Sequence, residues 1–147
     1  MKAVIQRVSK ASVEVENEIV GKIEKGFLIL LGVKTGDEKK DAEFLAKKCC
    51  AMRIFEDENE KMNLSLQDIG AKMLVISQFT LYGDAQKGNR PSFIGAAEPI
   101  IAEELYNYFI NYCKEIIGSE NVATGSFRKM MNVELTNYGP VTIIIES

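Results

Sequence analysis

The chain has 147 residues, a net charge of −3, and 46% hydrophobic and 27% charged residues. This length suits one domain with a substantial core, and the slight negative charge excludes a protein that an overall positive field holds on nucleic acid or anionic lipid. The chain contains no histidine, so it lacks the commonest general base and any Ser/His or Cys/His catalytic pair.

The first part of the chain has the patterns of paired strands. Residues 3–8 predict a first strand, and the strict alternation of residues 12–16 before a turn at Asn17-Glu18 predicts a hairpin. The run Phe27–Val33 is apolar on both faces, which is the pattern of a buried central strand. We therefore expect a sheet to begin at the N-terminus.

A helix and two further strands follow. Asp37 is predicted to cap a helix over about residues 38–52, because apolar residues recur there at helical spacing. Residues 53–55 indicate a short strand before an acidic turn, whose carboxylates lack the spacing of an EF-hand loop and are interpreted as solvated. Residues 73–78 predict the next strand, which leads into a polar motif.

The second half has the patterns of a long loop, a helix and a C-terminal hairpin. Residues 82–95 are rich in Gly, Asp, Asn, Pro and Ser, as is typical of a loop. The segment from Pro99 to about Ile117 has helical spacing and begins with a proline, which favours a helix start. Residues 131–135 and 141–145 predict two strands, with a turn between them at 137–140.

Together these elements predict one α+β domain over residues 1–147, with a mostly antiparallel sheet and two main helices. The three cysteines, Cys49, Cys50 and Cys113, form no CxxC pair, which favours reduced thiols in a cytoplasmic protein. Cys49 and Cys113 occupy apolar helix positions and are predicted to be core residues. We expect no signal peptide and no membrane span, and the sequence gives no ground for a metal or another cofactor.

The most informative motif is Ser77–Gly83, which places small polar residues at the end of an apolar strand. Hydroxyls, an amide and backbone N–H groups there can form an oxyanion hole, which needs no titrating group; they belong to Ser77, Gln78, Phe79 and Thr80. The alternative is a strand that stops in a turn, with Ser and Thr bonding local backbone. Thr80 as a nucleophile would need an adjacent base, so we expect it to position rather than attack.

A second motif, Asn137–Thr142, contains the dipeptide Gly139-Pro140. X-Pro bonds in folded proteins are cis only about 5% of the time, but a cis bond here would turn two carbonyls the same way and make an acceptor pair for an ammonium group. Arg7, on an apolar strand, either orients backbone carbonyls or emerges at the strand end. Four basic residues in loops beside the motifs are either phosphate contacts or solvated charges: Lys87, Arg90, Arg128 and Lys129.

Specific sequence blocks follow one another along nearly the whole chain: Ala3–Val8, Arg53–Asp57, Lys61–Ser65, Ser77–Tyr82, Lys87–Phe93, Ala123–Gly125, Phe127, Met131 and Asn137–Thr142. Together these blocks closely resemble the D-aminoacyl-tRNA deacylases, and the chain is identified as a member of that family. The resemblance implies a barrel-like fold and a homodimer. It also implies hydrolysis of the ester that joins a D-amino acid to the terminal ribose of tRNA, and clearance of glycine wrongly attached to tRNA.

The resemblance further implies a site shared between two subunits. Gly139-Pro140 would be cis and would reach into the partner subunit's pocket, where its carbonyls screen the amino acid by chirality because an L-residue would clash with main chain. A ribose hydroxyl of the tRNA would help to activate water. The remaining implied site residues are Ser77, Gln78, Phe79 and Thr80 around the ester, Phe127 and Met131 on the pocket wall, and Arg7 as a brace for the Gly-Pro carbonyls.

The chain departs from the family pattern at two places. Tyr138 stands where many relatives carry Asp, and Arg128-Lys129-Met130 is bulkier and more basic than the small residues usual there. Two other functions compete with ester hydrolysis of tRNA. One is a dimer that binds a small ligand or RNA without turnover, and the other is a general esterase that uses Ser77 or Cys50, for neither of which a base partner is visible.

Overall fold

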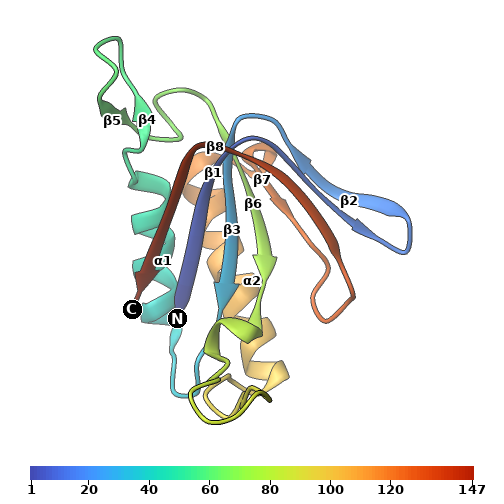
Figure 1. The fold of residues 1–147 in the computed structure, drawn as a ribbon. Coiled ribbons are helices and arrows are strands. Elements are labelled where there is room, and N and C mark those ends of the chain that lie inside the picture. The colour runs from blue at the N-terminus through green and yellow to red at the C-terminus, as the bar shows by residue number, and fades with distance from the viewer.

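The strand β1 (Lys2–Val15) runs through the centre of the fold (Figure 1). The structure is a computed structural model and describes residues 1–147. β1 is one strand of 14 residues, so the strands expected at 3–8 and 12–16 are continuous. One edge of β1 is divided between two antiparallel partners and its other edge pairs with a third; the partners are β2 (Glu18–Ile23), β3 (Gly26–Gly32) and β8 (Asn132–Glu146).

The sheet is mostly antiparallel, as expected, but two of its pairs are parallel. β6 (Lys72–Ser77) pairs with β3, and β7 (Val122–Thr124) pairs with β6, which gives the order β2-β1-β3-β6-β7. Parallel neighbours need a crossover, and a helix supplies each one. A Cβ added at Gly21 in β2 would lie 2.6 Å from the Thr124 carbonyl oxygen in β7, so the two ends of the sheet nearly meet. The sheet is therefore barrel-like and nearly closed.

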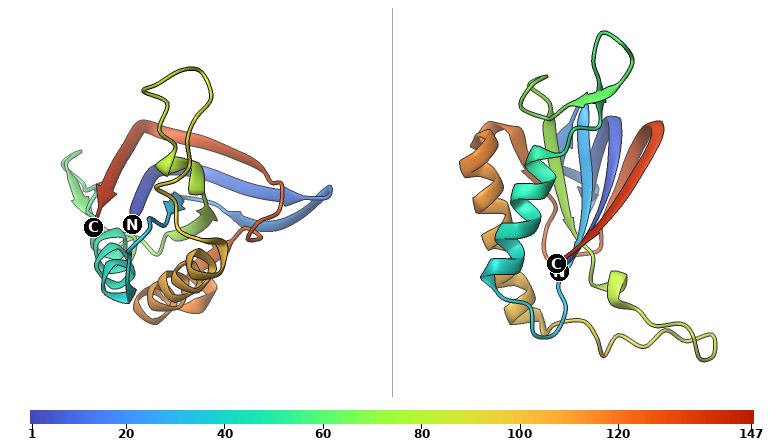
Figure 2. Two further views of the ribbon diagram at one scale, coloured as in Figure 1. Left: turned by 90° about the horizontal axis from the view of Figure 1, so that it is seen from below. Right: turned by 90° about the vertical axis from the view of Figure 1, so that its left-hand side faces the viewer.

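Two helices, α1 (Lys39–Ala51) and α2 (Pro99–Ile117), lie side by side on one face of the sheet (Figure 2), and both were predicted. The expected cap at Asp37 is wrong, because the N-cap is Glu38, whose backbone N–H donates to the Asp41 carboxylate at 2.8 Å. Asp37 instead accepts a hydrogen bond from the Met1 ammonium group at 2.8 Å. Neither helix is long and apolar enough to cross a bilayer.

Apolar side chains pack on both faces of the sheet. The larger cluster lies under the two helices and includes Phe27, Val75 and Phe109 together with all three cysteines, so Cys49 and Cys113 are core residues as predicted. The smaller cluster lies on the opposite, concave face, where Leu28 and Leu74 are buried. Phe27 and Leu28 thus face opposite ways, which explains why the run that contains them is apolar on both faces.

The expected C-terminal hairpin is wrong, because β8 is one strand of 15 residues along β1. Its register jumps opposite Arg7: Gln6 pairs with Thr142, but Val8 pairs with Asn137. Five residue steps on β8 therefore span two steps on β1, and residues 138–141 form a bulge instead of a chain reversal. A separate small hairpin, β4 (Phe55–Glu56) and β5 (Met62–Leu64), carries the acidic turn.

We predict that Gly26→Ala destabilises the fold by about 2 kcal/mol or more, because the new Cβ would lie 1.8 Å from the Lys72 carbonyl oxygen at the parallel β3–β6 pair. The matched control is Gly95→Ala, whose Cβ would meet its nearest neighbour at 3.7 Å. Urea unfolding followed by circular dichroism, at one protomer concentration, measures both. Equal unfolding free energies for the two variants would contradict this account of the β3–β6 contact.

Candidate functional site

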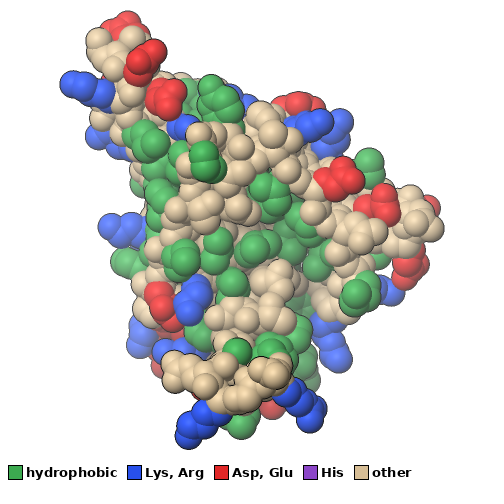
Figure 3. Space-filling view, in the orientation of Figure 1, with side chains coloured by type: hydrophobic (Ala, Val, Ile, Leu, Met, Phe, Trp, Pro, Cys, Tyr) green, Lys and Arg blue, Asp and Glu red, His purple; other side chains and the backbone are tan.

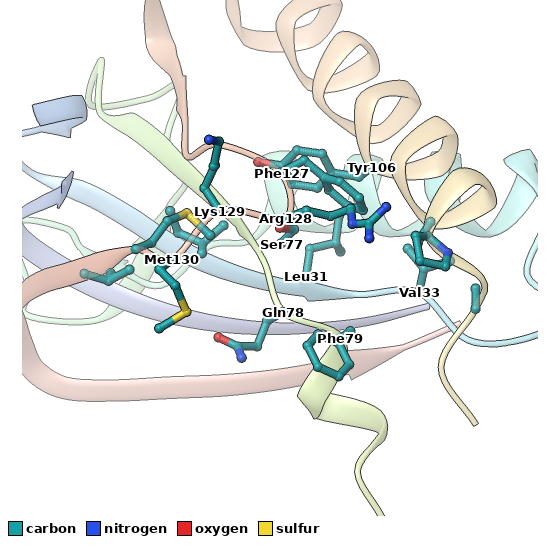
Figure 4. Close-up of a pocket in the computed structure, with 16 residues that line it drawn as sticks. Leu31, Val33, Ser77, Gln78, Phe79, Tyr106, Phe127, Arg128, Lys129 and Met130 are labelled. Carbon is teal, nitrogen blue, oxygen red and sulfur yellow. The ribbon is translucent and has the colours of Figure 1, made fainter. Parts of the chain in front are cut away.

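A cavity of about 510 Å³ lies where the parallel strands end and α2 begins (Figure 4). The carboxyl ends of parallel strands are a common place for ligand sites, because loops there leave backbone groups free. Three segments supply most of the wall: the end of β6 and the residues after it, the first turns of α2, and the loop between β7 and β8. The lining residues are Leu31, Val33, Ile76, Ser77, Gln78, Phe79, Ala97, Pro99, Ala102, Tyr106, Phe127, Arg128, Lys129, Met130, Met131 and Val133.

The polar motif forms one side of this cavity. β6 ends at Ser77, the Gln78 N–H donates to the Leu31 carbonyl at 2.8 Å, and a 3-10 helix, η1 (Phe79–Tyr82), follows. The first N–H groups of such a helix, those of Phe79 and Thr80, have no acceptor within it. The Gln78 side-chain amide donates to the Thr80 hydroxyl oxygen. This leaves the Thr80 proton free to point at another acceptor.

Tyr106 holds the floor of the cavity together. Its hydroxyl donates to the Val75 carbonyl at 2.9 Å, and the backbone N–H of Gly125 donates to the same oxygen at 3.1 Å. The Tyr106 ring contacts the Phe127 ring, with centroids 5.7 Å apart. Burial raises the pKa of the Tyr106 phenol, so this group remains protonated and donates. One buried acceptor thus joins β6, α2 and the loop that follows β7.

The loop after Phe127 gives the cavity a positive rim. Arg128 has a φ of 60°, which is uncommon for a residue with a Cβ, and is exposed. The Lys129 Nζ forms an exposed salt bridge with the Glu16 Oε1 at 3.3 Å, whereas Arg128 makes no ion pair. No carboxylate lines the cavity. The rim therefore suits an anionic neighbour such as a phosphate.

The chemistry open to this cavity is narrow. It holds no carboxylate, and the chain has no histidine, so no general base stands beside the Ser77 hydroxyl. Cys50 is 1% exposed and lies in the core, out of reach of a substrate. Nowhere in the chain do three or more His, Cys, Asp or Glu side chains gather in a way that could hold a metal ion. What the cavity offers a ligand is hydrogen-bond donors and an apolar wall.

The second motif lies away from this cavity and is gathered around Arg7. The Arg7 side chain is 3% exposed, and its Nε donates to the Tyr138 carbonyl at 2.8 Å. Its Nη1 donates to the Ile54 carbonyl at 2.7 Å. The Gly139–Pro140 peptide bond is cis, and both residues are exposed.

The structure thus brings the predicted site residues together in two groups. Ser77, Gln78, Phe79, Phe127 and Met131 line the cavity with Arg128 and Lys129, and Arg7 contacts the Gly139-Pro140 bulge. Thr80 stands beside the first group without lining it, and Lys87 and Arg90 lie on the exposed loop beyond η1. The role of Tyr106 in the cavity was not expected from the sequence. Helical spacing indicated that Tyr106 lies with Ala102 on the buried face of this helix, but not that this face ends in a cavity.

Comparison with known proteins places these features among related chains. The family model described as "D-Tyr-tRNA(Tyr) deacylase" matches residues 4–146. A D-aminoacyl-tRNA deacylase of Desulfatibacillum aliphaticivorans is 56% identical over 147 residues, covering 100% of this chain and 99% of the relative. A solved structure titled "c-Myc DNA Unwinding Element Binding Protein" is 40% identical with a TM-score of 0.95 and covers 100% and 99%. A probable eukaryotic D-amino acid tRNA deacylase, 15% identical with a TM-score of 0.82 and covering 99% and 98%, shares the fold.

We predict that Tyr106→Phe lowers the free energy of unfolding by about 1 kcal/mol, because the Val75 carbonyl loses one of its two donors while the ring and its packing remain. The matched control is Tyr138→Phe, whose hydroxyl makes no hydrogen bond in the structure. Thermal and urea unfolding measure both variants. A Tyr106→Phe protein as stable as the control would show that this hydroxyl does not fasten the cavity floor.

Proposed function

Because the chain belongs to the D-Tyr-tRNA(Tyr) deacylase family, we propose that it is an enzyme that hydrolyses the ester of D-aminoacyl-tRNA. Water adds across the ester, and free D-amino acid and tRNA leave. The observation that carries the proposal is the family match over residues 4–146. The Ser77–Phe79 segment, which was expected to surround the ester, lines a cavity in the structure. Because aminoacyl-tRNA is made and used in the cytoplasm, we place the activity there.

The ester is activated by hydrogen bonds rather than by a titrating side chain. The backbone N–H groups of Phe79 and Thr80 face the charge that develops on the ester carbonyl oxygen. Thr80 supports them as a donor, because its oxygen already accepts a hydrogen bond from the Gln78 amide and no base stands beside it. Thr80 therefore positions the substrate and does not attack it. Ser77 lines the cavity beside them, and Phe127 and Met131 form its wall.

The chiral screen comes from a second copy of the chain. Gly139 and Pro140 lie outside their own subunit's cavity, so they meet a substrate only if the bulge enters the cavity of a partner. β8 supports such a homodimer: it pairs with β1 alone, none of its residues is buried, and Ile144 is 64% exposed. The face over β8 carries hydrophobic side chains across its middle (Figure 3). β8 also leaves one long edge without a partner strand, and such edges are normally covered.

In the dimer, main-chain groups of the bulge hold the substrate's ammonium group while the donors near Phe79 hold its carbonyl. These two anchors leave one direction free for a side chain, so an L-residue clashes with main chain and is rejected. Glycine has no side chain to reject, and the same site clears glycyl-tRNA. Lys87, Arg90, Arg128 and Lys129 contact tRNA phosphates around the acceptor end. Arg7 braces the bulge from within its own subunit.

Two other functions make different predictions. The 40% identical protein of known structure is named for binding a DNA unwinding element. A dimer that only binds would protect a nucleic-acid ligand and would not turn it over. The family match over residues 4–146 and the relatives named D-aminoacyl-tRNA deacylase favour the enzyme. A general esterase would need a base beside Ser77 or access to Cys50, and the cavity offers neither.

We expect the purified protein to release tyrosine from D-tyrosyl-tRNA and not from L-tyrosyl-tRNA, with EDTA present throughout. The L-form is the matched control, since it differs only in the direction of its side chain. Release of the D-form at the uncatalysed rate, by a folded dimeric protein, would reject the enzyme and leave the binding dimer. Equal release of both forms would show that the bulge does not select.

Water is activated with the help of the tRNA itself, through the 2′-hydroxyl of the terminal ribose, because the cavity supplies no base. We predict that a D-tyrosyl-tRNA with a terminal 2′-deoxyribose is hydrolysed at least about 100-fold more slowly in single turnover, the lower range for a lost general acid or base. Each rate is divided by the uncatalysed rate of the same substrate, which removes the change in ester lability. An unchanged ratio would reject the ribose role.

A further inference from the structure

The residue that begins the β8 bulge contacts Arg7 twice. The Tyr138 carbonyl accepts the hydrogen bond from Arg7 Nε at 2.8 Å, and the Tyr138 ring lies against the guanidinium group with its centroid 5.1 Å from Arg7 Cζ. The ring is half-exposed, at 51%, and its hydroxyl makes no hydrogen bond. Tyr138 is not part of the hydrophobic core, so core packing does not account for the position of its ring against Arg7.

The remaining contacts of Arg7 fix one end of the guanidinium and leave its tilt weakly held. Nη1 donates to the Ile54 carbonyl at 2.7 Å, whereas Nη2 reaches the half-exposed Glu56 carboxylate only at 3.5 Å. A planar cation held by two good hydrogen bonds in its own plane can still rock out of that plane. An aromatic ring against one face opposes this motion, because the electron-rich face attracts the cation.

The position of the guanidinium sets the position of the next residue in the bulge. A Cβ added at Gly139 would lie 3.0 Å from Arg7 Nη2, so the Gly139 backbone packs directly against that nitrogen. Gly139 has a φ of 137°, in the region that glycine tolerates best. Movement of Nη2 therefore moves Gly139, and with it the main-chain groups that the bulge presents.

We propose that the Tyr138 ring is a positioning residue that holds the Arg7 guanidinium flat and thereby aims the Gly139-Pro140 bulge at the substrate. The inference rests on the proposed function, because it assigns the bulge to the chiral screen of that reaction. Tyr138 touches no reacting atom in this assignment. It acts through Arg7, and its ring rather than its hydroxyl is the active part.

The test compares three variants with two independent measurements. Tyr138→Phe keeps the ring, Tyr138→Leu keeps apolar bulk without an aromatic face, and Tyr138→Ala removes both. The first measurement is the hydrogen-exchange rate of the Arg7 Nε–H by NMR, which needs no substrate. The second is the ratio of kcat/KM for D-tyrosyl-tRNA to that for L-tyrosyl-tRNA, with kcat and KM determined separately.

We expect Tyr138→Phe to match the wild type in both measurements. Tyr138→Leu and Tyr138→Ala should raise the Arg7 Nε–H exchange rate and lower the D-to-L ratio, each by roughly 3- to 30-fold, the range of a cation–π contact. Sedimentation checks that each variant is as dimeric as the wild type. If Tyr138→Ala does not fold, the Leu variant decides the question alone.

Two results overturn the inference. One is an exchange rate and D-to-L ratio in Tyr138→Leu that equal those of the wild type. The other is a Tyr138→Phe protein as impaired as the Leu variant, which would assign the effect to the hydroxyl. A wild-type protein that hydrolyses neither substrate overturns the proposed function, and with it the inference that the Tyr138 ring positions the bulge toward the substrate. The exchange rates would still show separately whether the ring holds Arg7.

Discussion

The buried guanidinium group of Arg7 holds the β8 bulge, which carries Gly139-Pro140 and the proposed chiral screen. A charge that is 3% exposed is tolerated only when its donors are satisfied. Arg7 finds its acceptors on two segments that are distant in sequence, the Ile54 carbonyl and the Tyr138 carbonyl. At this point β8 stops pairing with β1 after Asn137 and resumes at Thr142 in a shifted register, and the Tyr138 carbonyl between them lies within reach of Arg7. The bulge that carries Gly139-Pro140 thus supplies one of the acceptors that the buried Arg7 charge needs.

The cavity depends on a different constraint, the parallel pairing of β3, β6 and β7. Each parallel pair requires a crossover, and the crossover helix α2 returns with its first turn at the ends of these strands. Tyr106 then fastens the helix to the Val75 carbonyl, one of the last acceptors before Ser77. The result is a cavity with backbone donors on one wall and aromatic rings on another. In the proposed mechanism it needs no titrating group, because its polar contacts are held in place before a ligand arrives.

These two constructions lie apart within one subunit, and this separation gives the homodimer its purpose in the proposed mechanism. In that mechanism the catalytic wall of one subunit works with the chiral screen of the other. Within each subunit the two features are held by different side chains: Arg7 bonds the bulge, and Tyr106 bonds the floor of the cavity. In the proposed dimer, the unpaired edge of β8 would join the copies and bring the bulge of one subunit to the cavity of the other.

The sequence by itself determined the elements whose signal is local. Helical spacing and Pro99 predicted α2, and the doubly apolar run at Phe27 predicted a buried strand. The polar residues at the end of β6 indicated either an oxyanion hole or a turn, and the structure places Ser77, Gln78 and Phe79 at a cavity. Only the tertiary structure decided the long-range features. It replaced the Asp37 cap by Glu38 because the Met1 ammonium claims Asp37, and it turned the expected hairpin at 137–140 into a bulge because β8 follows β1. Such choices depend on which distant partner satisfies a charge or a strand edge, and no pattern of neighbouring residues records that.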